Sequence, residues 1–132
     1  MGFEDKPDLV AGLITTRDAS ERPAEEGEGL LSHVAEVTVI IENRGDAIAA
    51  ETTTRFWITG ADIDQELRVI QTPPLLPGAE VEVTALWNMR GLDGPYDIIV
   101  TADAFSELDE MRKDNNAAVA HVVVRGTRVE LV

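Results

Sequence analysis

The chain has 132 residues, of which 44% are apolar, a formal net charge of -14 and no cysteine. This length fits one domain that can bury its own core, and the missing cysteines exclude disulfides, thiolate nucleophiles and cysteine zinc sites. The negative charge argues against nucleic acid and anionic membranes as partners, and no apolar run approaches the ~20 residues that cross a bilayer.

Period-two alternation of apolar and polar residues predicts β-strands along most of the chain. In the run VAEVTVIIEN, for example, Val37, Val39 and Ile41 share one face. The predicted strands, in chain order, are DLVAGLIT (8–15), VAEVTVIIEN (34–43), TTTRFWITG (52–60), LRVIQ (67–71), EVEVTALW (80–87), YDIIVTAD (96–103) and AAVAHVVVR (117–125).

Turn and loop residues separate these strands. NRGDA (43–47) and RGLDGP (90–95) each carry glycine where the chain must reverse, and TPPLLPGAE (72–80) contains breakers that exclude a sheet interior. The segment 16–29 is polar and predicts a long loop. Because short connections cannot form parallel crossovers, the pattern predicts an all-β, antiparallel β-sandwich of about seven strands.

The ends of the chain suggest where the domain begins and stops. Residues 1–6 are charged and without pattern, which is typical of a linker or an expression remnant, and they lack the features of a signal peptide. The domain is predicted to occupy residues 7–126. Residues 127–132 are interpreted as an extension of the last strand or as a linker.

A carboxylate-rich segment, FSELDEMRKDNN (105–116), precedes the last predicted strand. Calcium takes about six to eight oxygen ligands, but the spacing counted from Asp103 fails the EF-hand pattern. Acidic residues followed by basic ones, behind Ser106 as a cap, instead predict a short helical turn before the last strand. Calcium remains the alternative interpretation, with the candidate ligands Asp103, Glu107, Asp109 and Asp114.

Two further motifs have a functional and a structural interpretation. Arg44, Gly45 and Asp46 form a tripeptide that integrin-type receptors can read, but a glycine with positive φ in a tight turn explains it more simply. His33 and His121 would have to meet on one face to bind a metal. Because they lie on separate predicted strands, two unconnected surface histidines are the favoured interpretation.

Trp57 is the remaining candidate for a ligand contact. If it points outward beside Arg55 and Thr59, it is the first surface residue to mutate in a search for a ligand. Burial against Trp87 in the core is the favoured interpretation. No combination of serine, histidine and acidic residues carries the local pattern of a catalytic site, so no catalytic residue, cofactor or enzymatic activity is predicted.

Several segments together resemble the CARDB family, the cell-adhesion-related domain of bacterial and archaeal surface proteins. The similar segments, in the family's order, are PDLVAGLIT (7–15), VTVIIENRGDAIA (37–49), TTRFWITG (53–60), LLPGAEVEVTALW (75–87), GPYDIIVTAD (94–103) and ELDEMRKDNNAA (107–118). The resemblance implies an immunoglobulin-like sandwich, often in tandem within large exported proteins, and no enzymatic activity.

The expected function is therefore that of a non-catalytic immunoglobulin-like module in a secreted or cell-surface protein. It would serve adhesion, spacing or binding of an unidentified protein or carbohydrate partner, in the cell envelope or outside the cell, beside tandem neighbouring domains. The alternatives are a calcium-dependent protein- or carbohydrate-binding domain and an accessory domain of an exported enzyme.

Overall fold

The computed structural model describes residues 6–18, 34–104, 116–125 and 128–132. Every regular element in this part of the chain is a β-strand. The strands are β1 (Leu9–Asp18), β2 (Val34–Asn43), β3 (Thr52–Gly60), β4 (Asp64–Thr72), β5 (Glu80–Asn88), β6 (Gly94–Thr101), β7 (Ala117–Arg125) and β8 (Arg128–Leu131). The helical turn that we predicted within 105–115 lies outside the described residues.

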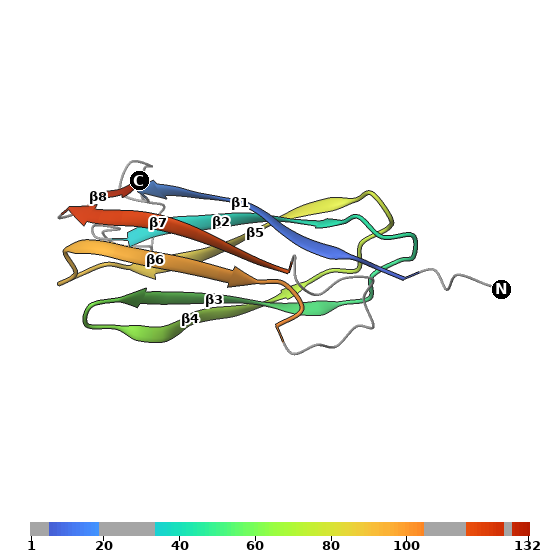
Figure 1. Cartoon of the computed structure of the whole chain (residues 1–132), viewed down its shortest axis with the longest axis horizontal. Helices are drawn as coiled ribbons and strands as arrows, with labels where there is room; N and C mark the ends of the chain where they lie inside the picture. The colour runs from blue at the N-terminus through green and yellow to red at the C-terminus, as the bar shows by residue number, and fades with distance from the viewer. Residues whose placement is uncertain (1–5, 19–33, 105–115, 126–127) are drawn as a thin grey trace, which may run out of the picture.

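The strands form two antiparallel sheets that pack face to face (Figure 1). The small sheet has the order β1-β2-β5, and the large sheet has the order β4-β3-β6-β7-β8. Strand β1 begins near one end of the long axis, whereas β8 lies toward the opposite end (Figure 1). The predicted all-β, antiparallel sandwich is confirmed. None of the described residues forms a helix that could cross a membrane.

The core lies between the inner faces of the two sheets. Val37, Val39 and Ile41 of β2 have no exposed surface, as their alternation predicted. They face residues of the large sheet such as Phe56, also fully buried. Trp87 of β5 closes one part of this core, where its ring meets Tyr96 edge-on with centroids 5.9 Å apart.

The C-terminal end differs from the sequence-based expectation of a strand extension or a linker. Arg128–Leu131 form a separate strand, which folds back and pairs antiparallel with β7 in the register Arg125↔Arg128. The reason is tertiary: Val129 is buried in the core, and its backbone N–H donates a 3.0 Å hydrogen bond to Oδ1 of Asp18 on β1. The described residues therefore form eight strands, in line with the expected sandwich of about seven.

Candidate functional site

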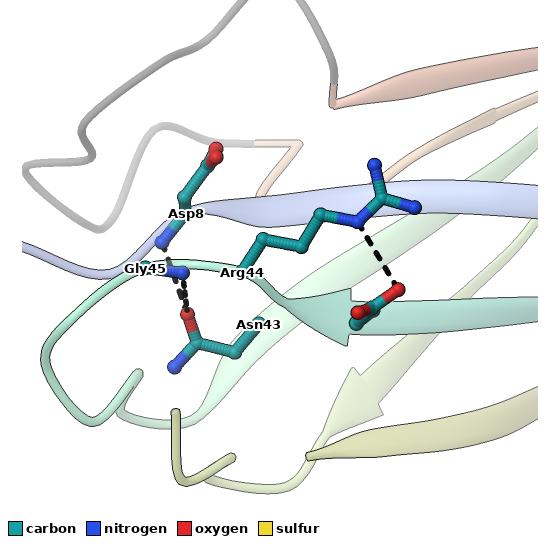
Figure 2. A network of polar contacts seen from close by, with 5 residues as sticks. Asp8, Asn43, Arg44 and Gly45 are labelled. Atoms are coloured by element: carbon teal, nitrogen blue, oxygen red, sulfur yellow. Dashed lines mark hydrogen bonds and ion pairs between the residues drawn. The ribbon is translucent and has the colours of Figure 1, made fainter. Parts of the chain in front are cut away.

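The turn after β2 is organised by the buried side chain of Asn43 (Figure 2). Its Oδ1 accepts hydrogen bonds from the backbone N–H groups of Asp8 (3.1 Å) and Gly45 (3.0 Å). Its Nδ2 donates to the carbonyl oxygens of Ala47 (2.8 Å) and Leu75 (3.0 Å). One amide thus joins the N-terminal segment, the turn and the loop before β5, and all its ordinary bonding positions are used.

The Arg44-Gly45-Asp46 tripeptide lies in this turn as part of the fold. The N–H groups of Arg44 and Asp46 donate to the carbonyl oxygens of Asp8 (2.8 Å) and Lys6 (2.9 Å). Gly45 does not have the positive φ that we predicted. It is required because a Cβ atom there would lie 2.2 Å from the Lys6 oxygen and 2.5 Å from the Asp8 nitrogen. The close approach of two segments explains this glycine.

The acidic segment before β7 is described only at its borders. Asp103 is buried, with 4% of its surface exposed, and has a φ of 47°. Such left-handed backbone is tolerated by a short polar side chain. Asn116, whose Nδ2 donates to the Ala102 carbonyl oxygen at 3.3 Å, is also buried. The other candidate calcium ligands, Glu107, Asp109 and Asp114, lie outside the described residues.

Trp57 points away from the core, so the favoured interpretation of burial against Trp87 is wrong. Its neighbours Phe56 and Ile58 are buried, and strand alternation therefore directs Trp57 outward. The indole Nε1–H donates to Oδ1 of Asp64 at 2.6 Å, and the Arg55 guanidinium lies 5.7 Å from the ring centroid. Because Phe56 and Trp57 are adjacent in one strand, they cannot both face inward. The sequence alone therefore indicates that one of the two rings points outward.

His121 also lies on the outer face of the large sheet. Its Nδ1 is 2.6 Å from Oδ1 of Asp97, the residue opposite it on β6. Both side chains are largely in solvent, with 68% of His121 and 44% of Asp97 exposed. The surface position predicted for this histidine is confirmed, while His33 lies outside the described residues.

An apolar row crosses the same outer face, and sequence reasoning missed it. Trp57 on β3 stands opposite Ile99 on β6, which stands opposite Val119 on β7. Trp57 and Ile99 are half-buried, and Val119 is 55% exposed. We call these three residues the outer stripe. Finding it required the register between strands far apart in the sequence, which periodicity within one strand does not contain.

Comparison with known proteins agrees with this architecture. The model of the CARDB family matches residues 6–120. The chain belongs to the CARDB family. This assignment confirms the resemblance seen in the sequence. Among curated proteins, none matches this CARDB domain.

Solved structures with the same fold include other CARDB domains. A Pyrococcus furiosus CARDB domain, crystallised in complex with di-metal ions, is 24% identical, with 91% of this chain and 90% of that chain covered and a TM-score of 0.68. A putative cell surface protein domain from Methanosarcina acetivorans is 19% identical, with coverages of 91% and 93% and a TM-score of 0.67. β-Glucosidase 3B from Thermotoga neapolitana is 16% identical with a TM-score of 0.59, and only 17% of that chain is covered.

The metal complex of the Pyrococcus domain raises the question of whether this chain offers similar ligands. The described part of the chain contains no group of three or more histidine, cysteine, aspartate or glutamate residues that could hold a metal ion. The described residues therefore do not fit a metal centre, and we derive no metal chemistry from them.

Proposed function

We propose that this CARDB domain is a non-catalytic module of a secreted or cell-surface protein and that it serves adhesion, spacing or partner binding. The outer stripe carries the proposal. Apolar side chains scattered singly over a surface are ordinary, but a contiguous apolar row across three strands, with carboxylates beside it on β4 and β6, is typical of an interaction surface. The similarity to a Methanosarcina acetivorans putative cell surface protein supports the proposed location.

The start of β1 and the position of β8, which lie toward opposite ends of the long axis, support a spacing role (Figure 1). Domains in which the polypeptide begins at one end and finishes at the other can be joined in tandem into an extended chain. To test the location, we would treat intact cells of the source organism with protease and probe them with an antibody against this domain. Loss of the epitope from intact cells is expected, and an epitope lost only after lysis would contradict a surface location.

The β-glucosidase likeness concerns the fold and covers a small part of those enzymes, so a role as an accessory domain of an exported enzyme is a separate proposal. The sequence of the complete parent protein distinguishes the two. Within this domain we expect no turnover in a panel of glycoside, ester and peptide hydrolysis assays. Activity that one point substitution abolishes would contradict a non-catalytic role.

Calcium-dependent binding of a protein or carbohydrate remains the alternative, and the metal complex of the Pyrococcus domain is the observation that favours it. We would titrate calcium to about 10 mM, above the ~1 mM dissociation constants of weak extracellular calcium modules. The melting temperature and backbone amide shifts would be followed. We expect no saturable change, whereas a saturable rise abolished by Asp109→Asn and Asp114→Asn would establish the alternative.

A further inference from the structure

Polar residues border the outer stripe on β4 and in one neighbouring row, whereas its Val119 end lies beside exposed apolar residues of β1 and β8, Leu13 and Leu131. In its own row, Glu66 of β4 stands opposite Trp57 at the border of the sheet. The next row, two residues along each strand, contains Asp64, Thr59, Asp97 and His121 in register. Residues two apart on a strand are separated by about 7 Å. The carboxylates of Asp64 and Asp97 therefore lie in a row about 7 Å from the outer stripe.

The charges around the stripe are unequal. Three carboxylates, those of Asp64, Glu66 and Asp97, border it on β4 and β6, and Arg55 contributes a guanidinium on the opposite side. The net charge of the whole chain is also negative, with 25 acidic and 11 basic residues. Such a surface attracts cationic partners and repels anionic ones.

The shape of the stripe favours a peptide over a sugar. A carbohydrate would use the Trp57 ring, but it would gain little from the aliphatic side chains of Ile99 and Val119. An extended peptide places alternate side chains on one side about 7 Å apart, so two apolar side chains would cover the three strands. The intervening side chains leave the peptide on the side away from the stripe. Lysine or arginine side chains at these positions are flexible and several ångströms long, so they can bend toward the carboxylates in the neighbouring row.

We infer that the outer stripe binds an extended, basic segment of a partner protein. Its apolar side chains lie on Trp57, Ile99 and Val119, and its cationic side chains pair with Asp64, Glu66 and Asp97. This inference rests on the proposed function as a binding module and names the partner class and the surface.

The test uses a blocked hexapeptide of alternating lysine and valine, added to the complete domain and followed by NMR. We expect saturable shifts of the Trp57 indole N–H and of the Ile99 and Val119 amides. Trp57→Ser should weaken binding at least tenfold, and Asp97→Asn about threefold, because the apolar contact carries more of the affinity than an exposed charge. Melting temperatures would show that both variants are folded.

Matched controls lie on the outer face of the small sheet. Leu86 is 47% exposed on β5, and Glu82 is exposed on the same strand. Leu86→Ser and Glu82→Gln should leave peptide affinity within twofold of the wild type. The same peptide with glutamate in place of lysine should not bind.

Four results would overturn the inference. Two concern the domain: equal losses of peptide affinity in the stripe and control variants, and NMR shifts centred on the small sheet. Two concern the peptides: equal binding of the glutamate peptide, and absence of binding by the lysine peptide. Concentration-dependent shifts of the stripe without peptide, together with no peptide binding, would assign the surface to a second copy of the chain. Because surface exposure on intact cells is measured separately, failure of this inference can be distinguished from failure of the proposed surface location.

Discussion

The turn around Asn43 and the outer face around Trp57 both contain specific polar contacts, but they differ in burial. Asn43 has no exposed surface and makes four hydrogen bonds, whereas His121 on the outer face is 68% exposed. Water can replace a contact at an exposed site and cannot do so at a buried one. We therefore expect the contacts of the turn to stabilise the fold. The exposed contacts of the outer face contribute little to stability, so this face is available for binding.

The largest expected effect is the loss of the Asn43 side chain. Asn43→Ala removes four hydrogen bonds and leaves backbone groups of several segments without partners. We expect it to lower the free energy of unfolding by about 3–5 kcal/mol. Urea denaturation would measure this loss.

Asn88→Ala is the matched control for the Asn43 prediction, because Asn88 is exposed and its Oδ1 accepts one hydrogen bond from the Arg90 N–H at 3.0 Å. Its expected cost is about 0.5 kcal/mol. Similar losses for the two variants would contradict the distinction by burial.

Gly45→Ala tests the close approach of two backbone segments in the same turn. The added Cβ must displace the segment of Lys6 and Asp8, and the two backbone hydrogen bonds from Arg44 and Asp46 are lost with it. We expect a cost of about 2–3 kcal/mol and faster hydrogen exchange at the Asp46 amide.

Gly78→Ala is the control for Gly45→Ala, since Gly78 has a φ of 82° but open space around it. Its expected cost is the conformational term alone, about 1–2 kcal/mol, without faster exchange at Asp46. Unchanged exchange in Gly45→Ala would mean that the N-terminal segment is not anchored through this glycine.

Tyr96 is intermediate between the two regions, because its ring is in the core and its hydroxyl lies 3.4 Å from Oδ1 of Asp62. Burial, and then the negative charge of Asp62, raise the pKa of Tyr96 above its ordinary value of 10.0. The folded state therefore holds the proton more tightly than the unfolded state. The resulting stability is complete below pH 10 and is lost as the pH rises through the folded pKa.

Since the chain has one tyrosine, phenolate absorbance reports Tyr96 alone. We expect titration of the folded protein above the ordinary tyrosine value, and Tyr96→Phe should remove part of the alkaline loss of stability. A normal titration midpoint in the folded protein would contradict the assigned environment.

The smallest expected effect is the coupling between His121 and Asp97. A double-mutant cycle with His121→Ala and Asp97→Ala should give a coupling energy of about 0.2–1 kcal/mol, because both side chains are largely in solvent. Salt near 1 M should reduce it further. A salt-independent coupling above about 2 kcal/mol would show that this exposed pair stabilises the fold as a buried one does.

Much of the fold could be predicted from local pattern. Alternation identified the buried faces of β2, β5 and β6, and the breakers after β4 marked the loop that follows it. In β3 the same alternation directs Trp57 outward, because its neighbour Phe56 is buried. The candidate calcium ligands Glu107, Asp109 and Asp114 remain predictions from sequence.

By itself, the sequence determined which residues of most strands face the core, because side-chain direction in a strand follows from alternation alone. Only the tertiary structure decided which outward residues become neighbours. The outer stripe, the His121–Asp97 pair and the packing of Gly45 against Lys6 and Asp8 all join residues from different segments. Their contacts depend on sheet order and register, which are set when the two faces of the core close on each other.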